Sequence, residues 1–159
     1  MRANDIGYEK KVRRDGLILY NLQWPPYFYC ESKFDVLKTF TEMTGVYVIF
    51  MMNKYKRLTP LMVGGAWYTG LRPSILRVFD TVTLTTVPKE ISEIAADKDN
   101  KISIKYLEIY DLNDLTNIMY ALKDMYPDVH FDNNGLQPTE ESENVRLIDK
   151  NTKKYYRSK

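Results

Sequence analysis

Two apolar segments close together in the middle of the chain most constrain its fold. Residues 46–52, VYVIFMM, form an unbroken run with high β propensity, and residues 60–65, PLMVGG, form a shorter one. A strand that is apolar at nearly every position is typically covered on both faces. The polar and basic segment 53–59 separates the two runs. So short a connection predicts an antiparallel pair of strands at the centre of the fold.

The remaining segments predict helices and further strands around this pair. Residues 17–22 and 102–110 have the composition of strands, and residues 80–87 alternate threonine with valine or leucine, which is typical of an extended segment. Helices are predicted to begin at Ser32, Pro73, Pro88 and either Asp111 or Asn113. We therefore expect an α/β (α+β) fold with a small central sheet, mixed or antiparallel, of about three to four strands flanked by helices.

The first predicted helix has signals at both ends. Ser32 and an acidic residue three positions later have nearly the spacing of a capping box, which satisfies the first backbone N–H groups of a helix. Phe34, Leu37 and Phe40 recur at helical spacing and, with Val36 and Met43 beside them, predict the buried face. Gly45 is well placed to end the helix in a left-handed cap. A helix cap alone would therefore explain a glycine at position 45.

Length and composition divide the chain into one globular domain with two polar ends. A chain of 159 residues suits one domain with or without a tail. Residues 1–16, with KKVRR at 10–14, predict a flexible basic arm, which is either a solvated terminus or a phosphate contact. Residues 17–134 hold the predicted elements. Residues 135–159 are so polar that we expect a disordered or loosely packed tail.

The charge and the cysteine and histidine counts exclude several classes of protein. A net charge of +2 does not indicate nucleic-acid binding by the whole surface, so such an activity needs a local patch. One cysteine, Cys30, and one histidine, His130, exclude an internal disulfide and a Cys/His zinc site. No apolar run reaches the length of a membrane span, and the first residues lack the apolar core of a signal peptide. We expect a soluble cytoplasmic protein, in the host cytoplasm if the genome is viral.

The aromatic content has two interpretations. The chain contains 13 Tyr, 6 Phe and 2 Trp residues, and tyrosine suits both a core and a binding surface because it packs and also forms hydrogen bonds. An AT-rich genome, viral or bacterial, would enrich Tyr together with Asn, Lys and Ile without any functional cause. The tyrosine excess alone therefore does not identify a function.

The two central runs carry a motif-like pair of tripeptides. Residues 45–47 are Gly-Val-Tyr, and residues 62–64 are Met-Val-Gly. With the order of predicted elements, they make residues 45–127 resemble the GIY-YIG nuclease superfamily. In that family a Gly-Ile-Tyr strand pairs with a Tyr-Ile-Gly strand, a helix brings an arginine, a third strand follows, and a later helix brings a metal-binding glutamate. The resemblance implies cleavage of phosphodiester bonds in DNA.

The resemblance also implies roles for individual residues, and the match is partial. The family's tyrosine helps to activate the attacking water, its arginine neutralises the phosphate, and its glutamate holds one divalent ion. Tyr47 is retained, and Arg72 follows the second motif at a similar spacing, with Arg77 as the second choice. Met62 replaces the second tyrosine. The last helix has no glutamate, and Asn117 stands near its position, where a neutral amide would bind Mg²⁺ far more weakly.

A possible nucleic-acid surface follows from the connection between the central strands. There Lys54, Lys56 and Arg57 alternate with Tyr55, a pattern that can contact phosphates and stack on bases. Trp67 can stack on a base or anchor a protein partner. The same residues are equally typical of a solvated turn and of a packed core. The predicted nucleic-acid-binding residues are Lys54, Lys56, Arg57, Trp67 and Arg77.

Two hypotheses about function remain from the sequence. The first is a nucleic-acid-binding domain, for DNA rather than RNA, with a degenerate GIY-YIG-like core in which Tyr47 and Arg72 face the phosphate. Such a core has lost or weakened catalysis, and Mg²⁺ is required only if it is active. The second is a non-enzymatic module, on this or an unrelated small α/β fold, that binds another protein or a second copy of the chain through its Tyr/Trp-rich surface.

Overall fold

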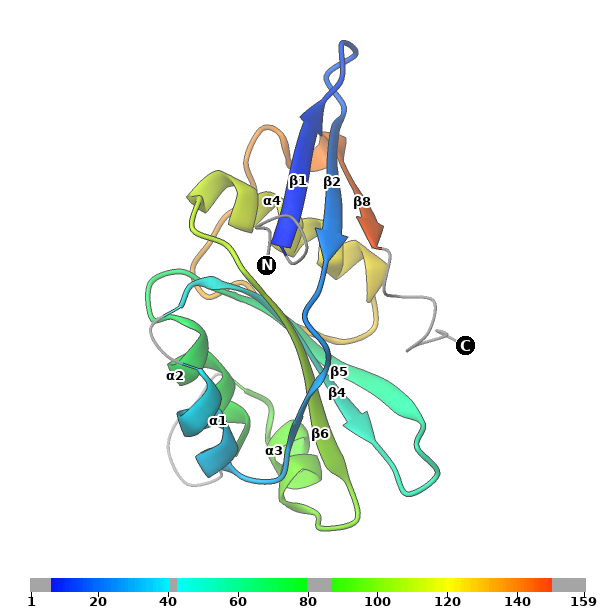
Figure 1. The fold of residues 1–159 in the computed structure, drawn as a ribbon, viewed down its shortest axis with the longest axis vertical. Helices are drawn as coiled ribbons and strands as arrows, with labels where there is room; N and C mark the ends of the chain where they lie inside the picture. Colours follow the sequence, from blue (N-terminus) through cyan, green and yellow to red (C-terminus); the bar gives the residue numbers. More distant parts are fainter. Residues whose placement is uncertain (1–6, 41–42, 80–86, 150–159) are drawn as a thin grey trace.

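Two sheets and four α-helices make up the structure, a computed structural model that describes residues 7–40, 43–79 and 87–149. The predicted α/β class is confirmed, but the sheet is larger than three to four strands (Figure 1). The predicted extended segment 80–87 lies outside the described residues except for Val87. The strands are β1 (Gly7–Val12), β2 (Ile18–Gln23), β3 (Phe28–Cys30), β4 (Gly45–Met52), β5 (Leu58–Ala66), β6 (Lys101–Glu108), β7 (His130–Asp132) and β8 (Val145–Asp149). The α-helices are α1 (Lys33–Thr39), α2 (Leu71–Leu76), α3 (Lys89–Ala96) and α4 (Leu112–Met125), and a 3₁₀ turn (Arg77–Phe79) follows α2.

The central sheet has the strand order β3-β6-β4-β5-β7. β4 pairs antiparallel with both β5 and β6, so the predicted hairpin of the two apolar runs is confirmed. β7 pairs parallel with β5, which makes the sheet mixed. The β4–β5 register shifts between Ile49 and Phe50, and Pro60 pairs directly after the shift. A bulge of this kind is where a strand tolerates a proline.

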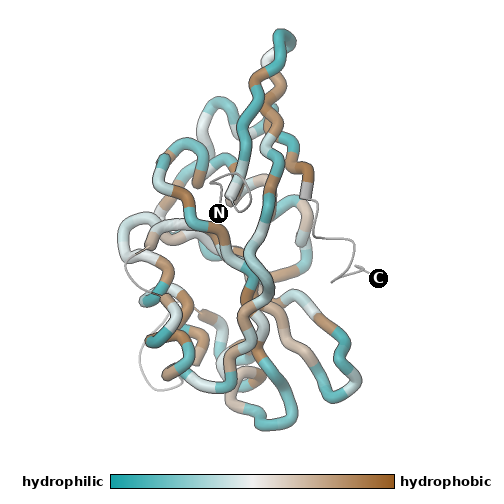
Figure 2. Tube along the Cα trace, viewed as in Figure 1, coloured by the Kyte–Doolittle hydropathy of each residue, from teal (hydrophilic) through white to brown (hydrophobic). Residues whose placement is uncertain are grey.

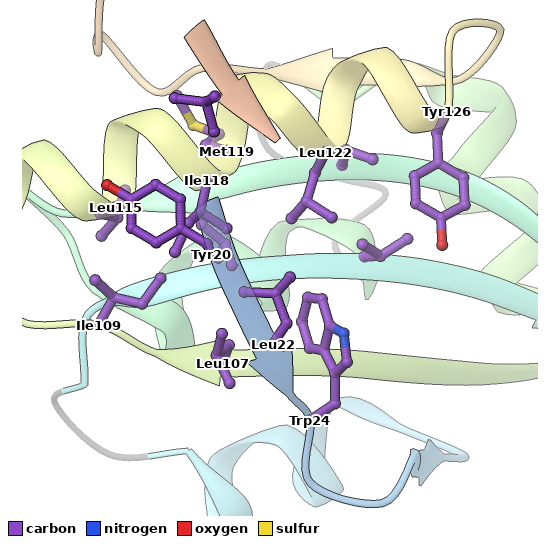
Figure 3. Close-up of a cluster of buried hydrophobic side chains, with 14 of the residues drawn as sticks. Tyr20, Leu22, Trp24, Leu107, Ile109, Leu115, Ile118, Met119, Leu122 and Tyr126 are labelled. Atoms are coloured by element: carbon purple, nitrogen blue, oxygen red, sulfur yellow. The ribbon is translucent and has the colours of Figure 1, made fainter. Parts of the chain in front are cut away.

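Each face of the central sheet has its own core. Alternate β4 residues Val46, Val48 and Phe50 lie in one cluster with α4 and β2. Tyr47 and Ile49 lie in the other cluster, with α1, α2 and α3. Figure 3 shows the first core, where side chains of α4 point toward those of β2 and β6. The prediction that the first apolar run is buried on both faces is therefore confirmed.

The second sheet has the order β1-β2-β8 and is built largely from the chain ends. β1 pairs antiparallel with β2, and β8 pairs parallel with β2. The sequence predicted a flexible arm at 1–16 and a disordered tail at 135–159. The structure differs, since residues 7–12 and 145–149 are strands. The residues of β1 are mostly polar, and β8 pairs with a strand at the other end of the chain. Local composition therefore does not reveal either strand.

The trace coloured by hydropathy shows how these layers are arranged (Figure 2). Apolar segments run through the middle of the molecule, whereas the tips of the β1–β2 and β4–β5 hairpins are hydrophilic. The two tips extend toward opposite ends of the long axis (Figure 1). In the part of the chain that the structure describes, no helix combines the length and apolar character required to cross a membrane.

Adjacent glycines in β5 allow both layers to approach the sheet closely. A Cβ added to Gly64 would lie 2.4 Å from the Tyr47 hydroxyl oxygen, so the tyrosine crosses the backbone of its partner strand. A Cβ added to Gly65 would lie 2.4 Å from the Met119 sulfur on α4. Glycine is the residue that permits such close approach. Packing against Tyr47 therefore explains Gly64, the glycine of the second tripeptide.

Gly45 differs from its predicted role. It is not in the left-handed region, because it is the first residue of β4, and the α1 C-cap is Phe40. A Cβ at position 45 would meet the Leu107 carbonyl oxygen on β6. Close backbone packing between β4 and β6, and not a helix cap, requires this glycine.

The capping signal of α1 is confirmed, and its predicted buried face is confirmed only in part. The Ser32 side chain accepts a hydrogen bond from a helix N–H group, and Asp35 completes the capping box. Val36 and Phe40 are buried as predicted, whereas Phe34 is 63% exposed and Leu37 is 41% exposed. α1 has only seven residues, and docking against α2 and β3 buries a narrower stripe than the periodicity predicts.

We predict that Gly64→Ala destabilises the protein by about 1–3 kcal/mol, because the new methyl group would force the Tyr47 ring out of its position. Urea unfolding of the variant and the parent protein measures the difference. In a Tyr47→Leu background the ring is absent, so the same substitution should have a much smaller effect. An equal loss of stability in both backgrounds would contradict the packing explanation.

Candidate functional site

Tyr47 is wholly buried on the face of the sheet that α1, α2 and α3 cover. The Arg77 guanidinium is the polar group that interacts with its hydroxyl. Burial raises the pKa of Tyr47, the Asp132 carboxylate raises it further, and the Arg77 guanidinium acts in the opposite direction. A buried, neutral phenol cannot readily serve as a base toward water, because its ionised form is disfavoured. Its position fits a core residue.

Arg77, and not Arg72, is the arginine whose charge acts on the Tyr47 hydroxyl. Arg77 begins the 3₁₀ turn after α2, and its Nη2 lies 2.6 Å from Oδ2 of Asp132 at the end of β7. Its Nε donates to the Ser74 carbonyl. The Asp132 side chain is 10% exposed and that of Arg77 is 24% exposed. The charge of Arg77 is thus largely compensated within the fold.

Arg72 has a structural contact in place of the predicted phosphate-facing position. Its Nε donates to the Phe40 carbonyl oxygen at 2.5 Å. Phe40 is the C-cap of α1, where backbone carbonyls lack partners inside the helix. The contact holds the start of α2 against the end of α1. The structure therefore does not place Arg72 together with Tyr47 in one open site.

Asn117 lies on the other side of the central sheet from Tyr47. It is fully buried in α4, donates to the Tyr20 hydroxyl and to Glu141, and accepts from the Thr139 hydroxyl. These partners come from β2 and from the segment that precedes β8. Asn117 therefore links α4 to the second sheet and is not placed to complete a metal site with Tyr47.

The described side chains of this face do not fit a divalent ion of the family's kind. Among the described residues, no group of three His, Cys, Asp or Glu side chains is close enough to hold a metal ion. Asp132 is the carboxylate that acts on the Tyr47 hydroxyl, and it is already paired with Arg77. Mg²⁺ prefers several oxygen ligands, including free carboxylates. No metal-dependent step can be assigned to this face.

A polar cluster around Asp114 was not predicted from the sequence. Its carboxylate accepts hydrogen bonds from the Tyr8 hydroxyl at 2.7 Å and the Tyr20 hydroxyl at 2.8 Å, and the Lys10 ammonium is 3.2 Å away. Burial opposes the charged form, but these three partners outweigh it and lower the pKa of Asp114. The cluster fastens β1 and β2 to the first turn of α4. The one sequence signal for this cluster is that Asp114 lies in the first turn of its helix.

Lys105 is a second group that sequence patterns do not reveal. It lies in β6 and is 1% exposed, and its Nζ is 4.5 Å from the centre of the Trp24 ring. An aromatic face partly replaces the solvation that a buried ammonium loses. Trp24 belongs to the segment between β2 and β3, so this contact closes that segment over the sheet. No nearby sequence signal pairs the two residues.

The predicted nucleic-acid residues are divided between the surface and the core. Lys54, Tyr55, Lys56 and Arg57 are all exposed in the β4–β5 turn, Tyr55 at 76%. The Asn53 side chain accepts from two backbone N–H groups of this turn and so fixes its shape. Among the described residues, no ion pair involves these three cations.

Trp67 is only partly exposed, because it packs against the core on the α4 side. Its neighbour Tyr68 is 70% exposed. The exposed aromatic residue of this segment is therefore Tyr68. With Arg77 ion-paired in the interior, the turn is the part of the predicted surface that is accessible to a large ligand.

We predict that Asp114→Asn destabilises the protein by about 1.5–3 kcal/mol at neutral pH, because an amide cannot replace a carboxylate that accepts two hydroxyls and faces an ammonium. The folded-state pKa lies below the unfolded value of about 3.9. The contribution of Asp114 is therefore complete above that value and is lost as the pH falls through the folded-state pKa.

Thermal unfolding between neutral and acidic pH measures this difference. The gap between the parent protein and Asp114→Asn should narrow below about pH 4. Asp124→Asn, at an exposed position of the same helix, is the matched control and should change little. A gap that is constant across the whole range would contradict the role given to the carboxylate.

Comparison with known proteins adds a family but no activity. No curated protein and no solved structure matches the sequence. One family model, described as "Uncharacterised protein", matches residues 8–159. Because this match covers nearly the whole chain, the protein belongs to that family.

Proposed function

We propose that the protein is a non-catalytic nucleic-acid-binding domain that contacts DNA through the β4–β5 turn. The observation that carries the proposal is the state of the turn cations. Lys54, Lys56 and Arg57 are exposed and surround an exposed Tyr55, and no described acidic side chain pairs with them. Lysine and arginine contact phosphates, and an exposed aromatic ring can stack on an unpaired base.

The order of elements supports a core that resembles the GIY-YIG nucleases. The Gly-Val-Tyr strand β4 pairs with β5, a helix with an arginine (α2) follows, and after the additional helix α3 come β6 and α4. Apart from α3, this is the order that the resemblance implies. The support is limited to the order and pairing of the elements, because the motif residues also have the packing roles described above.

The contacts of the motif residues favour loss of catalysis. Tyr47 is buried against Gly64, Arg77 is neutralised by Asp132, and Arg72 holds α1. Phosphodiester cleavage requires cationic groups that face developing negative charge on the phosphate oxygens. Tyr47 is covered, and both arginines are engaged in contacts within the fold. We therefore propose that binding is retained and cleavage is not.

The geometry of the turn suits a phosphate backbone. Lys56 has a positive φ of 62°, and the turn is closed by the hydrogen bond from Lys56 N to the Asn53 carbonyl. Lys54 Nζ lies 5.3 Å from the centre of the Tyr55 ring. The turn therefore presents a fixed group of cations with an aromatic surface, and it needs little ordering when it binds.

We predict salt-sensitive binding to duplex, branched and single-stranded DNA, without cleavage when Mg²⁺ is added. Replacing Lys54, Lys56 and Arg57 with glutamine should lower the affinity about tenfold or more and reduce the slope of log K against log salt by about 2 to 3. Titrations at several salt concentrations, with the products resolved on a gel, measure both.

The matched control for this experiment replaces Lys33, Lys38 and Lys98, three exposed lysines of α1 and of the α3–β6 connection. This control has the same change in net charge and should keep most of the salt slope. Equal effects of the two triple variants would contradict a specific role of the turn. Mg²⁺-dependent cleavage by the parent protein would contradict the loss of catalysis.

A different surface favours the alternative of a protein-interaction module. Phe34 and Leu37 are exposed one turn apart on α1, and Tyr29 on the neighbouring edge strand β3 is 51% exposed. Exposed apolar side chains that lie close together are typical of interaction sites. Binding through them should tolerate high salt, unlike binding through the turn. A second copy of the chain would suit this surface as well as a different protein.

Sedimentation of the parent protein and of a Phe34→Ser, Leu37→Ser variant tests the self-association form of this alternative. Association that increases with protein concentration and disappears in the variant would support it. A parent protein that sediments as a monomer at all concentrations would remove the second copy as the partner.

A further inference from the structure

The β1–β2 hairpin forms a ribbon that projects from the body of the protein (Figure 1). β8 pairs with β2 from Ile18 to Leu22, nearly the whole of that strand, so the part that projects without a third strand is the turn at residues 13–17. The turn beyond is closed by the hydrogen bonds from Arg13 N to the Leu17 carbonyl and from Gly16 N to the Arg13 carbonyl. Every residue from Glu9 to Gly16 is exposed. The tip of this ribbon is thus ordered by its own backbone and is covered by none of the described elements.

The two faces of the ribbon differ in what they contact. On the inner face, Tyr8, Lys10 and Tyr20 reach the Asp114 carboxylate. Since side chains alternate along a strand, Glu9 and Lys11 point to the outer face. The inner contacts hold the ribbon against α4 and so fix the direction in which its tip points.

Basic residues gather at the tip and on the adjoining outer face. Lys11 pairs with Leu19, which in turn pairs with Arg146 on β8. Leu147 packs against the core, so its neighbour Arg146 points outward, and it is exposed. Arg13 and Arg14 lie in the turn itself. We call this group the ribbon patch: Lys11, Arg13, Arg14 and Arg146.

We infer that the ribbon patch binds duplex DNA by placing the β1–β2 tip in the major groove. The inference rests on the proposed nucleic-acid function and adds a second contact and the form of the substrate. The major groove of B-form DNA admits a two-stranded β-ribbon. Arginine and lysine at its edges are placed to contact the phosphates of both strands.

The side chains of the patch favour duplex DNA over other nucleic acids. The outer face beside the patch carries Leu19, Asn21 and Gln23, so it lacks the aromatic rings on which unpaired bases stack. The major groove of A-form RNA is too narrow and deep to be read by side chains. The ribbon therefore fits the B-form groove best.

Acidic neighbours reduce the positive charge of the patch but do not cancel it. Arg13 Nη2 lies 3.2 Å from Asp15, and the two side chains are 51% and 58% exposed. Solvent screens such a pair, which adds little stability and can exchange for a phosphate. Among the described residues, Lys11 and Arg14 have no acidic partner.

The test uses a mixed-sequence DNA duplex two helical turns long and a Lys11→Gln, Arg14→Gln, Arg146→Gln variant. We expect an affinity about tenfold or more lower and a salt slope smaller by about 2 to 3, as for three lost phosphate contacts. The Lys33, Lys38 and Lys98 variant is again the charge-matched control. Circular dichroism and thermal unfolding check that each variant is folded.

Methylation with dimethyl sulfate identifies the groove, because guanine N7 lies in the major groove and adenine N3 in the minor groove. We expect the parent protein to protect N7 and the ribbon variant to lose that protection. Protection of adenine N3 alone, or equal affinity for an RNA duplex of the same sequence, would overturn the inference.

The same titration separates this inference from the proposed function. A parent protein that binds DNA, with a ribbon variant that binds as tightly as the lysine control, would overturn the ribbon contact and leave the β4–β5 turn as the binding site. A parent protein that binds none of the DNA forms would overturn the proposed function and the ribbon contact together.

Discussion

The close packing of both layers onto β4 and β5 is the constraint on which the rest of the structure depends. Gly64 leaves room for the Tyr47 ring on one face, and Gly65 leaves room for Met119 of α4 on the other. Gly45 lets β4 approach the backbone of β6. Side chains at these three positions would separate layers that are in contact. The glycines that resemble a nuclease motif therefore also specify a sheet with a core on each face.

This packing explains why the motif residues have lost contact with solvent. A tyrosine that crosses its partner strand is covered by the helices above it, and burial then favours the neutral phenol. Arg77 is partly buried beside Tyr47, where Asp132 from β7 compensates its charge. A partly buried charge without such a partner would be unfavourable. Residues that could have formed a phosphate site instead stabilise the junction of α2, β5 and β7.

The predictable parts of the fold are those specified by residues near one another in the sequence. The capping box at Ser32, the apolar run of β4 and the periodicity of α4 predict their elements well. The strands at the two ends were missed for two reasons. β1 pairs with β2 in a local hairpin, but the polar residues of β1 do not indicate a strand. β8 pairs with β2 from the other end of the chain, and Tyr8 bonds to Asp114, 106 residues away. Likewise, the Arg77–Asp132 pair joins positions 55 residues apart. No local pattern can specify such partners.

The placement of charged side chains decides where this protein could attract nucleic acid. A net charge of +2 leaves little long-range attraction for nucleic acid, so affinity must come from places where cations lack acidic partners. Among the described residues, Lys54, Lys56 and Arg57 at one hairpin tip and Arg14 at the other have no acidic partner, whereas Arg13 pairs with the exposed Asp15. Since the tips lie toward opposite ends of the long axis, one short duplex turn could not easily contact both. The two proposed contacts would therefore add to one another only on a longer or bent DNA, or would bring two DNA segments together.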